Sequence, residues 1–165
     1  MPTKKNSIFL AIGIALSLVS CQNNIVFVKN KNMSNAWKEK DTAIFTWNVK
    51  DTIKPYNLYF NIRNNKNYAY NNIFLIASIQ NNKGYTEIDT LEYQMALPDG
   101  TLMGKGFSDV KENKLWYKEN YKFKNTGNYT FKITQALREN GKKQGIEELK
   151  GIMEVGLQIE NTQTK

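Results

Sequence analysis

One cysteine, at the end of an apolar segment, carries the clearest chemistry in the sequence. Lys4 and Lys5 precede an uncharged apolar run over Ile8–Val19, which is followed by Ser20 and Cys21. As a helix the run would span about 18 Å, well short of the ~30 Å hydrocarbon core of a bilayer, and is typical of a secretory signal. An aliphatic residue three positions before the cysteine and a small residue beside it form a bacterial lipobox. We therefore predict that residues 1–20 are removed and that the thiol of Cys21 carries a lipid.

A lipid on Cys21 predicts a bacterial envelope protein whose first partner is a membrane. Each buried CH₂ contributes about 0.8 kcal/mol and a single acyl chain holds only marginally, so the two or three chains of a lipoprotein make attachment durable. Gln22 follows the cysteine, so the acidic signals for inner-membrane retention or surface export are absent. We expect an outer-membrane lipoprotein that faces the periplasm. The alternative is ordinary signal cleavage, with Cys21 incidental.

The rest of the chain is poor in catalytic residue types. The 165 residues contain no histidine and one cysteine, which excludes Ser-His-Asp and Cys-His nucleophiles, internal disulfides and most zinc sites. Gly104-Lys105-Gly106 lacks the spacing of a phosphate-binding P-loop, and Ser108 has no histidine to activate it. We therefore predict a non-enzymatic protein without a cofactor or a bound metal.

Carboxylates offer the remaining route to an enzyme. Asp89 and Glu92 lie in one predicted strand region, and Asp99, Asp109 and Glu112 lie in one predicted loop. Because glycosidases act through two carboxyl groups at a set separation, a hydrolase that uses Asp109 and Glu112 is a further hypothesis. Spacing within a loop fixes no distance, so solvated or lysine-paired carboxylates are the simpler expectation.

The net charge of the chain is +8, from 23 Lys and Arg against 15 Asp and Glu. The mature chain stays positive without Lys4 and Lys5, and its lysines are scattered without a run of five. Nucleic acid is excluded as a partner because an exported chain does not meet it. Lipid head groups, lipopolysaccharide and acidic glycans are the anionic partners of an envelope. A solvated, lysine-rich surface is the simpler explanation.

Two segments have the composition of binding loops. Arg63–Asn72 is polar and rich in tyrosine and asparagine, and Ala96–Trp116 has poor strand character over a length at which loops tend to be functional. Tyrosine, tryptophan and arginine are enriched at binding hot spots. The predicted partner-binding residues are Tyr56, Arg63, Tyr68, Tyr70, Lys105, Trp116 and Tyr117. The alternative is a long hairpin loop whose tyrosines cap the edge of the domain.

The loops interrupt a domain of alternating strands. Apolar and polar residues alternate over Thr42–Val49 and Tyr56–Arg63, whereas Ile73–Gln80 is apolar on both faces, as in a central strand. Asn81-Asn82-Lys83-Gly84 predicts a hairpin into Tyr85–Met95. That last run changes phase near Thr90, which predicts a β-bulge.

The second half of the chain continues this pattern. The segments predicted as strands are Leu115–Phe123, Asn128–Leu137 and Gly151–Glu160. We interpret Arg138–Lys150 as a loop with one helical turn at Glu147–Lys150. With Ile25–Lys29 there are about eight strands, which predicts an all-β, antiparallel two-sheet sandwich of jelly-roll type. An immunoglobulin-like sandwich is the alternative, although its Cys…Trp…Cys signature is absent. The predicted organisation is a lipidated tether over 21–36, one domain over 37–161 and a tail over 162–165.

An ordered set of short motifs extends over nearly the whole chain. It consists of Cys21, Asn35-Ala36-Trp37, Pro55-Tyr56-Asn57-Leu58, Ile62-Arg63-Asn64-Asn65, Asp89-Thr90-Leu91-Glu92-Tyr93, Pro98-Asp99-Gly100, Gly104-Lys105-Gly106, Glu112-Asn113-Lys114-Leu115-Trp116-Tyr117, Gly127-Asn128-Tyr129 and Leu149-Lys150-Gly151-Ile152. This set resembles the GldH family of gliding-motility lipoproteins of the Bacteroidetes.

The resemblance implies a non-enzymatic structural or assembly role. It places the chain beside other gliding-motility lipoproteins and the type IX secretion machinery, as envelope partners, and it transfers no catalytic residue. A periplasmic carbohydrate- or peptidoglycan-binding module is the alternative function, because jelly rolls often bind glycans on aromatic surfaces.

Overall fold

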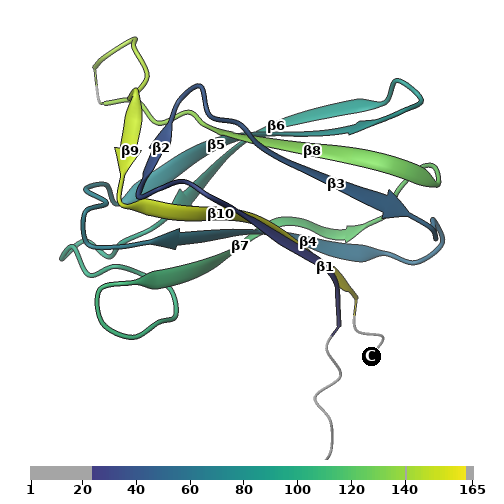
Figure 1. The fold of residues 1–165 in the computed structure, drawn as a ribbon, viewed down its shortest axis with the longest axis horizontal. Helices are drawn as coiled ribbons and strands as arrows, with labels where there is room; N and C mark the ends of the chain where they lie inside the picture. Colours follow the sequence, from purple (N-terminus) through teal and green to yellow (C-terminus); the bar gives the residue numbers. More distant parts are fainter. Residues whose placement is uncertain (1–23, 140, 163–165) are drawn as a thin grey trace, which may run out of the picture.

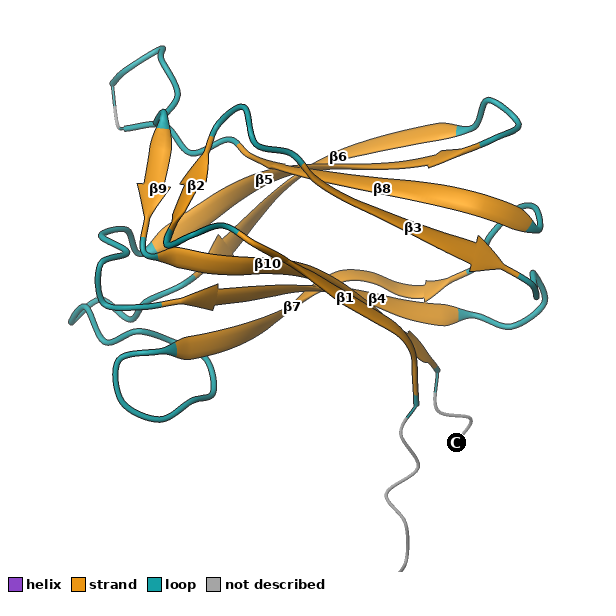
Figure 2. Ribbon diagram, viewed as in Figure 1, coloured by secondary structure: helices purple, strands orange, loops and turns teal. Residues whose placement is uncertain are grey.

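The computed structural model describes residues 24–139 and 141–162, which form ten β-strands and no helix (Figures 1 and 2). The predicted signal segment and Cys21 lie outside the described residues. In the described part of the chain, no helix has the length and hydropathy to cross a membrane.

The strands follow one another with short connections, apart from three longer loops. In chain order they are β1 (Ile25–Asn32), β2 (Ala36–Lys38), β3 (Ala43–Val49), β4 (Tyr56–Asn64), β5 (Asn72–Asn81), β6 (Thr86–Gln94), β7 (Lys111–Tyr121), β8 (Gly127–Gln135), β9 (Glu148–Lys150) and β10 (Ile152–Asn161). The longer loops precede β5, β7 and β9.

Two four-stranded antiparallel sheets face each other. Their strand orders are β1-β10-β4-β7 and β3-β8-β5-β6, and β2 pairs with β9 in a small third sheet. With the two short strands left aside, the chain changes sheet at every connection except the β5–β6 hairpin, and the first and last strands pair. This connectivity is that of a jelly roll. The predicted antiparallel sandwich is confirmed, with ten strands in place of about eight.

The hydrophobic core lies between the sheets. The inward-facing residues of β3 and β4, such as Phe45, Leu58 and Phe60, are buried as their alternation predicts. The predicted outward residue Tyr59 is buried as well, because the ring of Trp116 on β7 lies 4.4 Å from its own ring. Asn61, also predicted outward, is covered and donates a hydrogen bond of 2.8 Å to Gln158.

The bulge predicted near Thr90 is wrong. The pairing of β6 with β5 is regular from Gln94 to Thr86. The apparent change of phase arises because Glu87 and Asp89 occupy inward positions while Ile88 points outward. The ammonium group of Lys118 on β7 neutralises both carboxylates, at 2.5 and 3.0 Å, so the inward charges are paired.

The helical turn predicted at Glu147–Lys150 is also wrong. Glu148–Lys150 is strand β9, and its Leu149 lies opposite Trp37 of β2. Both side chains are fully buried, and the indole N–H of Trp37 donates to the backbone oxygen of Asp41 at 2.6 Å.

The predicted tether contains β1, which pairs along β10 over its length.

Candidate partner-binding surface

The strand registers divide the loops between two opposite ends of the sandwich. Ile25 of β1 and Asn57 of β4 both lie opposite Glu160 of β10, so β1 and β4 begin where β10 ends. We call this the terminus end, and it also carries loops 50–55, 81–85 and 122–126. The opposite end, which we call the loop end, carries loops 33–35, 39–42, 65–71, 95–110 and 136–147. Figure 1 shows the terminus end on the right and the loop end on the left.

The two predicted binding segments lie side by side at the loop end. The ammonium group of Lys66 is 2.9 Å from the carboxylate of Asp109, which joins the β4–β5 loop to the β6–β7 loop. The backbone oxygen of Asn71 accepts the N–H groups of Met95 and Ala96, at 2.7 and 3.1 Å. Segments that the sequence treats as separate candidates therefore form one surface.

The β6–β7 loop has a regular backbone of its own. Ala96 pairs with Leu102 across the Pro98-Asp99-Gly100 turn, and Lys105 pairs with Glu112 through two backbone hydrogen bonds of 2.7 and 2.9 Å. The carboxylate of Asp99 accepts the N–H of Thr101, and this hydrogen bond lowers the pKa of Asp99. The predicted 21-residue irregular segment is thus shorter, because β7 already begins at Lys111.

Two glycines allow this loop to lie against β7. Gly104 and Gly106 have φ angles of +103° and +150°, a region that L side chains rarely adopt. A Cβ on Gly104 would come within 2.7 Å of the backbone oxygen of Glu112, and one on Gly106 would overlap the backbone oxygen of Val110. The loop is therefore held close to the strand by its backbone and presents its remaining side chains outward.

The most exposed large apolar side chain of the described residues is at the tip of this loop. Phe107 is 96 % exposed, and Leu97 on the preceding turn is 43 % exposed. Lys105 beside them forms no ion pair within the described part of the chain. Sequence reasoning missed Phe107, although its position between Gly106 and Ser108, both at positive φ, is the signal of a projecting residue.

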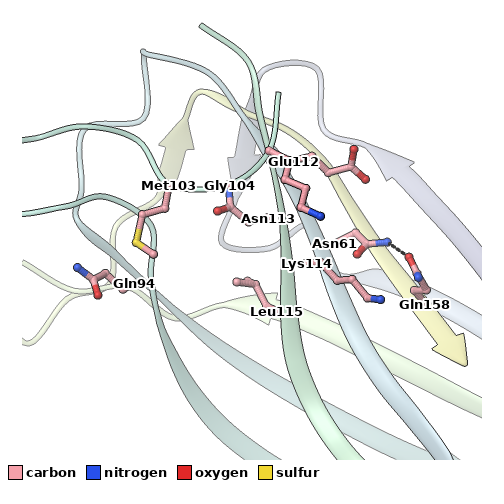
Figure 3. A pocket seen from close by; sticks show the side chains of 10 residues that line it. Asn61, Gln94, Met103, Gly104, Glu112, Asn113, Lys114, Leu115 and Gln158 are labelled. Carbon is pink, nitrogen blue, oxygen red and sulfur yellow. Dashed lines mark hydrogen bonds between the residues drawn. The ribbon is translucent and has the colours of Figure 1, made fainter. Parts of the chain in front are cut away.

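A groove of about 460 Å³ lies beside the loop along the edge strand β7 and is lined by residues from both faces of that strand (Figure 3). Met103 and Leu115 form an apolar part, and Asn61, Lys114 and Gln158 form a polar part. Below it, Asn113 donates a buried hydrogen bond of 2.9 Å to Asn64. Amides, the two lysines Lys105 and Lys114, and Glu112 can hold a ligand by hydrogen bonds and shape.

Four of the predicted partner-binding residues reach the surface. Arg63 is exposed and bound to Glu154 at 3.3 Å, Lys105 lies on the β6–β7 loop, and Tyr70 is half-buried within the β4–β5 loop. Trp116 is 52 % exposed on the outer face of β7. Three of the four lie at the loop end, and Trp116 lies midway along β7, opposite Tyr59.

The other three predicted residues belong to the core. The hydroxyl of Tyr68 donates to the backbone oxygen of Asn72 at 2.7 Å, and burial raises the pKa of Tyr68. Tyr117 stacks on Phe60 with ring centroids 4.4 Å apart. Tyr56 lies at the terminus end, far from the loops. We therefore retain only the exposed residues in the candidate surface, and assign these three tyrosines to packing.

The candidate catalytic carboxylates are dispersed. Asp89 accepts a hydrogen bond from Tyr117 inside the sandwich edge, whereas Glu92 points outward and accepts one from Asn72 at 2.6 Å. Glu112 lines the groove, but Asp109 is bound to Lys66 and does not. Within residues 24–139 and 141–162, no three acidic or cysteine side chains gather as a metal site.

Comparisons with known proteins give one consistent result. A family model described as GldH lipoprotein matches residues 25–159. The chain is 51 % identical to the gliding motility lipoprotein GldH of Flavobacterium johnsoniae, over 94 % of this chain and 96 % of the relative. It is 43 % identical to a gliding motility lipoprotein GldH homolog of Christiangramia forsetii, with the same coverage of 94 % and 96 %.

Solved structures offer only a distant likeness. The VP2 subviral particle of infectious bursal disease virus aligns with a TM-score of 0.34 at 13 % identity, over 81 % of this chain and 30 % of that one. A structure of the Gx strain of the same virus aligns with a TM-score of 0.30 at 8 % identity, over 86 % and 35 %.

Proposed function

The chain belongs to the GldH lipoprotein family, and on that premise we propose that it is a non-enzymatic, lipid-anchored component of the gliding-motility apparatus. In this proposal the loop end binds another envelope protein of the motility and type IX secretion machinery. The observation that carries the proposal is the rigid, two-loop surface joined by Lys66 and Asp109, from which Phe107 projects.

The anchor of the proposed protein is the lipidated Cys21 in the outer membrane, facing the periplasm. Asn24, three residues later, is held at the start of the sandwich, since its backbone oxygen accepts the N–H of Asn161 at 2.8 Å. Three residues span at most about 11 Å. The terminus end is therefore kept at the membrane, and the loop end is presented away from it.

The anchor is tested by labelling cells with radioactive palmitate. We expect the wild-type protein to incorporate the label and Cys21→Ser to lose it, because serine has no thiol for the diacylglyceryl group. Equal labelling of the two proteins would contradict the anchor.

The loop surface suits a protein partner because binding energy concentrates in a few projecting anchors. A rigid aromatic side chain on a preorganised loop loses little conformational entropy on binding. Phe107 and Leu97 supply apolar contacts, and the unpaired Lys105 next to them favours an acidic rim on the partner.

The loop surface is tested in a gliding host by replacing Phe107 with serine. We expect reduced spreading on agar at a normal level of lipidated protein, since Phe107 contributes to binding and not to folding. The matched control is Ile88→Ser, which changes an exposed apolar residue on the outer face of β6, outside both the loop end and the terminus end. Normal spreading of Phe107→Ser cells would refute a role for this loop.

A carbohydrate- or peptidoglycan-binding function is the second candidate, and Trp116 favours it. Its half-exposed ring shares the outward face of β7 with Lys114, which lines the amide-rich groove, and sugars stack on such rings. In a sedimentation assay with purified cell wall, a glycan module would co-sediment and Trp116→Ala would stay in solution. A wild-type protein that does not co-sediment would remove this candidate.

A further inference from the structure

The two ends of the sandwich differ in their balance of charge. Loops 50–55, 81–85 and 122–126 of the terminus end contain a single acid, Asp51. Their exposed lysines are Lys50, Lys54, Lys83, Lys122 and Lys124. The loop end carries six basic residues, Lys40, Lys66, Lys105, Arg138, Lys142 and Lys143, and six acidic ones, Glu39, Asp41, Asp99, Asp109, Glu139 and Glu147. Among the loops, positive charge is therefore in excess at the terminus end only. The strands near that end carry the acids Glu119 and Glu160, and Glu160 is paired with Lys114 at 2.6 Å.

The lysines of the terminus end, which we call the lysine patch, lie on adjacent loops. Val49 lies opposite Gly127 and Tyr56 opposite Tyr121, so loop 50–55 adjoins loop 122–126. The ammonium group of Lys83 is 3.5 Å from the side-chain oxygen of Asn125, which joins loop 81–85 to loop 122–126. Lys124 lies over the ring of Tyr85 at 4.2 Å from its centroid. Among the described residues, the one ion pair in this patch is the long contact of 3.9 Å between Lys54 and Asp51. The patch is thus largely uncompensated.

An exposed apolar residue lies within this basic patch. Ile53 is 84 % exposed at the tip of the β3–β4 loop, between Lys50 and Lys54. The loop is fixed by the carboxylate of Asp51, which accepts the N–H groups of Ile53 and Lys54 at 2.8 and 3.3 Å. An apolar tip among lysines matches the boundary between anionic head groups and acyl chains.

We propose that the terminus end is a second membrane contact, which binds an anionic bilayer through this lysine patch and Ile53. The inference rests on the proposed anchor at Cys21, which keeps Asn24, at the same end of the sandwich as the patch, within about 11 Å of the lipid-bearing residue. The lysines act on the lipid surface once the sandwich is oriented so that they lie within the Debye length, about 8 Å at physiological salt. The contact orients the sandwich and directs the loop end away from the bilayer.

The experiment measures which end touches lipid in the mature, lipidated full chain. Because the lipid occupies the thiol of Cys21, Ile53→Cys introduces a single site for a fluorescent label, and Phe107→Cys is the control at the opposite end. Each protein is reconstituted in phosphatidylethanolamine vesicles with or without phosphatidylglycerol, and both contain head-group spin-labelled lipid. We expect strong quenching at position 53 only, with loss of quenching in neutral vesicles or at 1 M salt. Equal quenching at both positions, or quenching independent of lipid charge, would overturn the proposal.

Two variants that remove the same number of lysines distinguish an effect of the patch from an effect of total net charge. Quenching at position 53 gives the ratio of anchored chains whose terminus end contacts the bilayer to those whose terminus end does not. We expect the quadruple variant K50Q/K54Q/K83Q/K122Q to lower this ratio about fivefold for each lysine removed. The control variant K105Q/K111Q/K142Q/K143Q has the same net charge and should leave this ratio unchanged. If both variants lower the ratio equally, the proposal that the patch binds the bilayer is wrong. A chain that does not co-float with vesicles would instead refute the anchor. A chain that co-floats without charge-dependent quenching refutes only this contact.

Discussion

The two ends of the sandwich hold their shape by different means. At the loop end the backbone does so, through isolated strand bridges and through glycines at positive φ that lie against neighbouring backbone, such as Gly104 and Gly106. At the terminus end, buried rings do so. Phe123 lies at the centre of this cluster, with the rings of Trp47, Tyr56, Tyr121 and Tyr129 at 4.8 to 5.9 Å.

This difference explains which end can carry unpaired charge. Packed rings hold the short loops of the terminus end from below, so its lysines need no partner to fix the backbone. The long loops of the loop end also insert buried side chains, among them Tyr68, Met95 and Leu137, but they add ion pairs such as Lys66–Asp109, in which the base has an acid as its partner. The same contrast predicts where substitutions will be costly.

The largest expected effect is at the centre of the ring cluster. Phe123→Ala should lower the free energy of unfolding by about 3–5 kcal/mol, because it removes a buried ring and leaves a cavity. Urea unfolding of the purified domain measures it. Phe107→Ala, the same substitution at the exposed loop tip, should change stability by no more than about 0.5 kcal/mol. A similar loss of unfolding free energy in both variants would show that buried rings do not hold the terminus end.

The next effect concerns the backbone at the loop end. Gly151 has a φ angle of +82°, and a Cβ there would overlap the backbone nitrogen of Tyr68. Gly151→Ala should therefore cost more than the ~1–2 kcal/mol of the strained φ alone. Gly141→Ala isolates that strain, since Gly141 has a φ of +81° and open space around it. Equal melting temperatures of the two variants would show that the close packing is unimportant.

A smaller effect, dependent on pH, comes from the cluster on the β6 and β7 edges. Burial by itself raises the pKa of Glu87, but hydrogen bonds from Lys118, Tyr85 and Tyr121 outweigh it and hold that pKa below 4.5. Because the folded pKa is below the unfolded value, Glu87 stabilises the protein above about pH 4.5. This contribution is lost as pH falls through the folded value.

Glu87→Gln tests this contribution. At pH 7 the variant should be less stable by about 1.5–3 kcal/mol, the usual size for hydrogen bonds to a charged group. The difference from wild type should shrink as urea unfolding is repeated from pH 5 to pH 3. Glu92→Gln, on the outward face of the same strand, is the control. A constant difference across this range would contradict the assignment.

The smallest effect concerns the lysine patch. Since like charges repel, replacing Lys50, Lys83, Lys122 and Lys124 with glutamine should raise stability slightly, by a few tenths of a kcal/mol per residue at low salt. The gain should vanish at 1 M salt, where the Debye length is about 3 Å. Thermal unfolding at two salt concentrations measures it, and a loss of stability would show that these lysines support the fold.

Periodicity was sufficient for the long strands and insufficient for the short ones. Strands β3, β4 and β10 alternate over seven residues or more, so a period of two is visible. Strand β9 has three residues and forms only because Leu149 meets Trp37, more than 100 positions earlier. The phase of β6 was misjudged because its inward carboxylates are neutralised by a lysine on another strand.

The candidate site was predictable only in part. Both binding segments were found from composition, because glycine, asparagine and tyrosine gather in them. The contact between the two segments and the exposure of Phe107 could not be predicted, because both depend on how the loops fold back on β7. Tyr68 and Tyr117, predicted to bind a partner, are buried in the core. The residue type alone does not show whether a tyrosine faces the core or the solvent.

Local residue order is enough for the strand alternation, for the absence of histidine chemistry and for the lipobox at Cys21, whose lipid stays a prediction. These features depend on neighbours within about ten positions, so they need no knowledge of the fold. The lysine patch is different. Loops 50–55, 81–85 and 122–126 are separated by long stretches of chain, and they meet because strand register brings their ends together. A surface built from distant segments exists only after the sheets have paired.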